Sequence, residues 1–174
     1  MVTCSKCHKP LTDPVSVESE MGPICRSREK IREALRDAQR GDKMIFISRP
    51  INDGIILARE DGKVATNVPW TCVSGSPDGF EWGYGGSGPS DLALNIVEAV
   101  LRRVGYKGPR TQCFKGDCFN LAYSLRYEFK VKYLAGLDRE GAILDYAPIK
   151  DWVITKVMNE NVERKGYDYE YKTR

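Results

Sequence analysis

The sequence predicts an α+β fold: a small antiparallel sheet followed by two or three helices, with an N-terminal zinc-knuckle-like appendage. Two observations lead to this class. Short apolar runs of β type come first, over residues 44–84, and apolar residues at helical spacing follow from residue 89 onward. Three of the six cysteines lie in the first 26 residues, which hold few large apolar side chains. Such a segment cannot bury a core of its own and needs a metal or another cross-link to fold.

The charged segment after these cysteines is expected to be helical. Ser27 is a suitable N-cap, helical spacing continues to about Arg40, and Gly41 ends the helix. We therefore divide the chain here. Residues 1–42 are predicted to form a cysteine-rich zinc-binding-like knuckle plus a charged helix. Residues 43–174 are predicted to form an α+β domain with a glycine-rich strand-to-helix turn.

Four strands are expected in the second domain. Residues 44–47, 54–58 and 64–66 are short apolar runs of β type, and residues 60–63 form a turn between the second and the third. In residues 80–84, three aromatic side chains alternate with glutamate and glycine. This alternation is typical of a half-buried strand.

Helices are expected after the strands. Apolar residues recur every four positions over residues 92–104, and Gly105 ends that helix. Residues 117–137 predict a second helix, and a third follows Pro148. The tyrosine-rich residues 167–171 alternate with acidic ones, which favours an edge strand or a loose tail.

The N-terminal cysteines predict a metal site. Cys4 and Cys7 are separated by two residues, a spacing that lets both sulfurs face one ion, and Cys25 follows a Gly-Pro turn that could present a third thiolate. We expect structural zinc here, with free or redox-active thiols as the competing interpretation. His8 is the candidate fourth ligand by type, although it adjoins Cys7. Three alternatives for that position stay open: Asp13, Cys113 and Cys118.

The segment 83–88 spells G-x-G-x-x-G between a predicted strand and a predicted helix, as a dinucleotide-binding loop does. Two observations weigh against that function. The preceding strand is not continuously apolar, and no acidic residue follows a second strand about 20 residues later. A structural turn is favoured over a phosphate cradle. Valine at Gly85 or Gly86 is then expected to cost about 1–3 kcal/mol through backbone strain.

A row of arginines four residues apart makes one face of the charged helix basic: Arg28, Arg32, Arg36 and Arg40. An acidic residue stands three positions before each of the last three: Glu29, Glu33 and Asp37. Such pairs stabilise an exposed helix, so a solvated surface explains the row as well as nucleic acid does. The net charge of +3 is small and spread along the chain, which argues against a dedicated duplex-DNA binder.

Several enzyme classes are excluded. A single histidine, His8, rules out sites that need two, and a histidine in the metal site leaves no base for a Ser-His-Asp triad. No P-loop motif is present. Paired carboxylates among the 24 acids stay open, as does a reactive thiolate at Cys113 or Cys118. Without a complete catalytic constellation, we expect a protein that is not an enzyme.

Two segments resemble known families. Residues 80–94, which run from Phe-Glu-Trp-Gly-Tyr-Gly-Gly-Ser-Gly-Pro to Leu-Ala-Leu, and the aromatic segment 127–133 resemble a family of unknown function found in phages, prophages and bacteria; this resemblance covers roughly residues 44–153. Residues 4–25, with their CxxC, Leu-Thr-Asp-Pro-x-Ser and Gly-Pro-x-Cys, resemble a second uncharacterised family thought to bind zinc. There, His8 stands where glycine is frequent, which leaves the fourth ligand open. The resemblances imply a small phage or mobile-element protein in the bacterial cytoplasm.

Three functions fit these observations. The favoured one is a non-enzymatic phage or mobile-element accessory protein that binds a host protein or complex, inhibiting a bacterial defence or nucleic-acid-processing machine. The second is a zinc-knuckle nucleic-acid-binding protein, and the third is a nucleotide binder or enzyme that uses the glycine loop. No membrane contact is expected. The expected binding residues are Arg28, Arg32, Arg36, Trp82, Tyr84 and Ser87.

Overall fold

The computed structural model describes residues 2–36 and 38–171, with side chains up to residue 160. Its centre is a five-stranded sheet in the order β1-β2-β4-β3-β7. The strands are β1 (Gln39–Arg40), β2 (Met44–Phe46), β3 (Ile55–Glu60), β4 (Lys63–Thr66) and β7 (Gly141–Leu144). β2 and β4 run parallel, whereas the other neighbours are antiparallel, so the sheet is mixed rather than wholly antiparallel.

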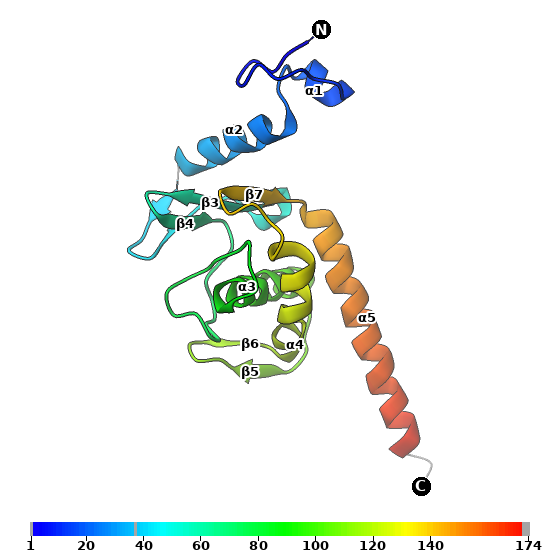
Figure 1. Ribbon diagram of the computed structural model, residues 1–174. Helices are drawn as coiled ribbons and strands as arrows, with labels where there is room; N and C mark the ends of the chain where they lie inside the picture. The colour runs from blue at the N-terminus through cyan, green and yellow to red at the C-terminus, as the bar shows by residue number, and fades with distance from the viewer. Residues whose placement is uncertain (1, 37, 172–174) are drawn as a thin grey trace.

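Helices cover both faces of this sheet (Figure 1). Helix α2 (Pro23–Arg36) lies on one face, and α3 (Ser87–Arg103) and α4 (Asn120–Phe129) lie on the other. The long helix α5 (Tyr146–Tyr171) runs beside α4 and away from the sheet. The α+β class is therefore confirmed. The N-terminal cysteine cluster is present, as predicted, and the segment before α2, with α1, lies apart from the sheet (Figure 1).

The predicted strands at residues 44–47, 54–58 and 64–66 are confirmed as β2, β3 and β4. The turn between the last two has Asp61 and Gly62 at φ +52° and +74°, the left-handed pair that a tight hairpin requires. The predicted strand at residues 80–84 is wrong, because this segment is an irregular loop. Its aromatic alternation arises because two rings of the loop point into the core.

The first predicted helix after the strands is confirmed as α3, and Gly105 follows its end at φ +75°. The second begins later than expected, because residues 117–119 form strand β6 (Asp117–Phe119), which pairs with β5 (Arg110–Gln112). Helix α4 then continues into a π-helical turn, η2 (Lys130–Leu134). The third is confirmed as α5, which includes residues 167–171, so this segment is not an edge strand.

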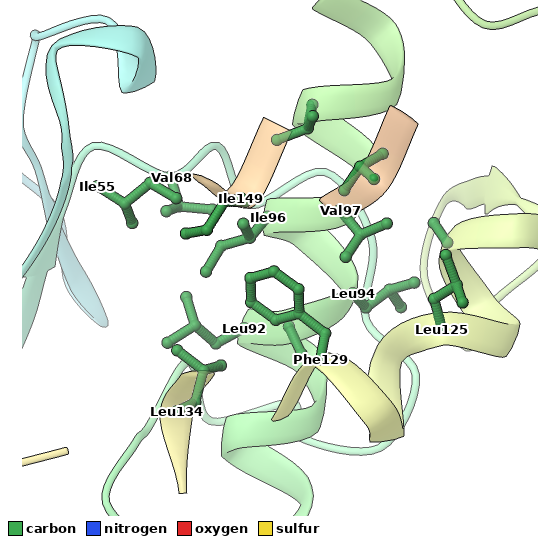
Figure 2. Close-up of a cluster of buried hydrophobic side chains, with 14 of the residues drawn as sticks. Ile55, Val68, Leu92, Leu94, Ile96, Val97, Leu125, Phe129, Leu134 and Ile149 are labelled. Atoms are coloured by element: carbon green, nitrogen blue, oxygen red, sulfur yellow. The ribbon is translucent and has the colours of Figure 1, made fainter. Parts of the chain in front are cut away.

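The main core lies between the sheet and the helices on its α3 side. Phe129 of α4 is fully buried near its centre, among apolar side chains from α3 and α5 (Figure 2). Its ring centroid lies 4.8 Å from that of Tyr133 and 5.6 Å from that of Trp152. Because α4 and α5 meet through these rings, burial in this cluster fixes the position of both helices on α3.

A smaller core lies under α2 on the opposite face of the sheet. Ala34 is buried there against the isoleucines of β2 and β3, with Ile31 and Leu35 beside it. The helix begins at Pro23 rather than at Ser27 and ends at Arg36, which corrects both predicted ends. This core joins α2, which belongs to the first predicted domain, to the sheet of the second. The division of the chain at residue 42 stays a prediction.

Two short helical elements complete the fold: α1 (Pro14–Glu18) and the 3-10 turn η1 (Ile51–Asp53). Within the described residues, none of the helices combines the length and the apolar character that a membrane span requires.

Candidate functional site

Cys4, Cys7 and Cys25 come together at the N-terminus, and their sulfur atoms all lie within 4.8 Å of one another. Two backbone hydrogen bonds close the turn that carries the first two: the amide of Cys4 donates to the carbonyl of Lys9, and the amide of His8 donates to that of Cys4, each at 2.9 Å. His8 takes the left-handed φ of +58° to complete this turn. The three thiols can therefore bind a metal ion, as the sequence predicted.

The third thiol comes from the start of α2. Pro23 is the first residue of the helix, and Cys25 lies in its first turn, so the predicted Gly-Pro turn is a helix start. The backbone amides of Gly22, Lys6 and Cys7 donate to the sulfur of Cys4 and lower its pKa to about 6. A thiol that ionises near neutral pH is ready to bind a metal ion.

None of the four residues considered for the fourth ligand joins this group within the described chain. His8 is exposed and serves the turn through its backbone. Asp13 instead caps α1, where its carboxylate accepts from the amide of Ser16 at 3.0 Å. Cys113 and Cys118 lie elsewhere, with Cys72.

The predicted arginine row is exposed over Arg28, Arg32 and Arg36 of α2, but Arg40 belongs to β1. Of the predicted acid–arginine pairs, the one between Glu29 and Arg32 is present at 3.8 Å. Glu33 pairs instead with Arg49, in the loop that follows β2, at 3.9 Å. Asp37 lies outside the described residues. This face of α2 is thus basic but partly neutralised.

Trp82 was predicted as a binding residue, and this prediction is wrong. Its side chain is fully buried, and its indole nitrogen donates to the carbonyl of Asp138 at 2.8 Å. Tyr84, two residues later, is 39% exposed, with the Arg139 guanidinium 5.3 Å from its ring centroid. Ser87 is exposed at the first residue of α3. Of these three residues, only Tyr84 and Ser87 are therefore accessible to a partner.

The glycine loop ends in a cavity of about 270 Å³ at the N-terminus of α3. Gly85, Gly86 and Ser87 form one wall, and Arg126 and Lys130 from the α4 side form the other. Both cations are more than nine-tenths buried. The Lys130 ammonium donates to the carbonyl of Gly85 at 2.8 Å, which ties this wall to the glycine loop.

Tyrosine rings hold the two cations. The Arg126 guanidinium carbon lies 3.6 Å from the ring centroid of Tyr123 and 4.1 Å from that of Tyr127, and the Lys130 nitrogen lies 5.0 Å from the latter. Among the described side chains, no carboxylate lies within 4 Å of either cation. Asp91 also lines the cavity, but its oxygens accept from three backbone amides, those of residues 74–76. We call Tyr123, Arg126, Tyr127 and Lys130 the α4 face.

Sequence reasoning missed the α4 face. The spacing of Tyr123, Tyr127 and Val131 on the helix was a signal, since three exposed apolar residues four apart mark one face. The burial of Arg126 and Lys130 had no signal in the sequence, because it depends on the glycine loop that folds against them.

Two segments of the chain match known protein families. Residues 1–30 match a family of unknown function, DUF6011, and residues 40–121 match another family of unknown function, DUF6166. No curated protein and no solved structure matches the chain. The chain is therefore similar to two uncharacterised families, and its function has to be argued from the site.

Proposed function

We propose that this protein is a non-enzymatic binding protein that docks, through the α4 face, on an acidic surface of a host protein or complex. One observation carries the proposal: Arg126 and Lys130 are buried cations without a carboxylate partner among the described side chains. A buried charge is costly unless it is paired, so these two favour a ligand that supplies negative charge.

The rest of the α4 face suits a protein partner. Tyr123 and Tyr127 are exposed beside the cations, and Val131 continues the same stripe. Tyrosine and arginine are enriched among the residues that carry most of the energy at protein interfaces. We extend the proposal to a phage or mobile-element origin and a host target, which is what the resemblance of residues 80–94 implies. Inhibition of a bacterial defence or nucleic-acid-processing complex in the cytoplasm is the corresponding proposal.

Nucleic acid is the second candidate partner, and the position of the cavity favours it. The first turn of α3 opens into the cavity beside Ser87, so its amides and the two cations could meet the same phosphate. The exposed ring of Tyr127 could then stack on a base. The exposed arginines of α2 would add phosphate contacts.

The Lys130→Gln variant tests the α4 face. It is expected to weaken binding to the partner captured from nuclease-treated host lysate by about tenfold or more, because it removes a desolvated charge from the interface. Lys132→Gln is the matched control, since it removes the same charge from an exposed position that does not line the cavity. Equal binding by both variants and the parent, with equal melting temperatures, would contradict the proposal.

A labelled single-stranded oligonucleotide separates the two partner classes. If phosphate is the ligand, the parent should bind it with an affinity that falls steeply from low to moderate salt, and Lys130→Gln should reduce the slope by about one counterion. If the parent does not bind the oligonucleotide but captures a host protein, the partner is a protein, as first proposed.

We also propose that Cys4, Cys7 and Cys25 hold zinc and that this metal stabilises the N-terminal segment. Cys25→Ser is expected to lower the zinc content by about one ion per chain, because it removes one of three thiolates. Amide exchange should then accelerate in residues 1–26 and stay unchanged in residues 44–153. Elemental analysis provides the measurement, with Ser5→Ala as the control in the same turn. Equal zinc in Cys25→Ser and the parent would reject the site.

A further inference from the structure

A second group of three cysteines lies on the α3 side of the sheet. Cys72 belongs to the loop before α3, Cys113 follows β5 and Cys118 lies in β6. Their sulfur atoms all lie within 4.8 Å of one another, and those of the last two are 3.3 Å apart. We propose that these three residues bind a second metal ion, a thiolate-preferring divalent cation such as zinc.

Two backbone hydrogen bonds bring the segments that carry the three thiols together. Val73 and Lys115 exchange hydrogen bonds of 2.8 and 3.1 Å, which hold the tip of the β5–β6 hairpin against the loop that carries Cys72. Gly116 makes this approach feasible, because a Cβ there would lie 2.4 Å from the carbonyl oxygen of Thr71. Its φ of +75° also favours glycine. The β5–β6 hairpin can therefore pack closely against the loop that carries Cys72.

Buried polar side chains fix both sides of the thiol group. The Asn95 carboxamide accepts from the amide of Cys72 at 3.1 Å and donates to its carbonyl at 2.8 Å. Glu98 is fully buried and accepts from the amide of Phe119, next to Cys118, at 2.8 Å. Metal sites are commonly held in place by such outer hydrogen bonds, which limit the movement of the ligands.

The spacing of the sulfurs suits a metal better than a disulfide. Thiolates around tetrahedral zinc, with zinc–sulfur bonds of about 2.3 Å, lie about 3.8 Å from one another. A disulfide between Cys113 and Cys118 would need its sulfurs at about 2.05 Å and would leave Cys72 without a role. No fourth ligand joins the group among the described residues, and Cys113 is partly exposed, so solvent can complete the coordination.

Charge also favours a cation at this position. The three sulfur atoms lie within 4.8 Å of one another, and Cys72 and Cys118 are fully buried. Three adjacent sulfurs cannot all ionise without a positive charge between them, because each thiolate raises the cost of the next. A divalent cation removes this conflict and would pin the hairpin to the loop.

Zinc analysis of the full-length chain, purified without chelator, tests the proposal. The parent is expected to carry about two zinc ions. The triple variant Cys4→Ser/Cys7→Ser/Cys25→Ser should keep about one, and Cys113→Ser added to it should lose that one. Phe114→Ala, at the 81% exposed hairpin tip, is the control and should keep it. Melting curves establish that each variant is folded.

Cobalt binding gives a second readout that needs no variant within the group. The triple variant loaded with Co²⁺ should show thiolate-to-cobalt charge-transfer absorption. The proposal is overturned if this variant binds neither zinc nor cobalt, whether its three core cysteines are free or Cys113 and Cys118 are found joined in a disulfide. If the triple variant keeps all the zinc of the parent and Cys113→Ser alone loses it, the N-terminal site fails and this one stands.

Discussion

Replacing Asp91 by alanine is expected to lower the free energy of unfolding by about 3–5 kcal/mol, the largest effect that we predict for a single polar residue. Asp91 is 1% exposed, and its carboxylate accepts from the amides of Ser74, Gly75 and Ser76 at 3.1, 3.1 and 2.8 Å. Alanine would leave three amide groups without their acceptor. Because hydrogen bonds to a charged acceptor are stronger than neutral ones, their loss is severe.

Thermal melts provide the measurement. At roughly 2–4 °C per kcal/mol for a chain of this length, the melting temperature should fall by about 10 °C. Asp91→Asn should fall between Asp91→Ala and the parent, since one amide oxygen can still accept. Asp78→Ala, an exposed acid close to the same loop, should change little. A melt of Asp91→Ala that equals the parent would show that solvent replaces the carboxylate.

Replacing Gly83 by valine is expected to cost about 3 kcal/mol. Gly83 has φ +78°, a conformation that β-branched residues rarely adopt, and a Cβ there would lie 2.9 Å from the carbonyl oxygen of Leu137. Gly85→Val is the matched control, because its Cβ would meet nothing within 4 Å and its φ lies outside the left-handed region. Equal melting temperatures for the two variants would contradict this assignment.

This prediction corrects the one made from the sequence, which placed the strain at Gly85 or Gly86. At Gly86, a Cβ would meet the ring of Tyr84, an exposed side chain that can move. Within the loop, the second glycine that packing requires is Gly88, whose Cβ would lie 2.7 Å from that of Glu81. The positions of the loop that require glycine are therefore the outer ones, Gly83 and Gly88. That the loop serves as a structural turn rather than as a phosphate cradle stays a prediction.

Local patterns in the sequence were sufficient for much of the fold. The runs that became β2, β3 and β4, the Asp61-Gly62 turn and helix α3 were predicted, because each is specified by its own period or turn residues. Likewise, the Cys4–Cys7 spacing and the later Cys25 were enough to predict a group of three thiols. In these elements, residues close in sequence decide the structure.

The elements that the sequence did not predict depend on contacts between segments that are distant in the sequence. Strand β7 was missed, because only its pairing with β3 makes a strand of residues 141–144. The aromatic alternation at residues 80–84 imitated a strand, because Trp82 points into the core for reasons of packing.

The candidate sites, too, depended partly on local sequence and partly on contacts between distant segments. By itself, the sequence determined the α+β class, the order of most helices and strands, and the N-terminal thiol group. Only the tertiary structure decided that Cys72 meets Cys113 and Cys118, and that Arg126 and Lys130 are buried beside the glycine loop. The physical reason is that periodicity and turn residues report the local backbone, whereas burial and side-chain encounter depend on which segments pack together.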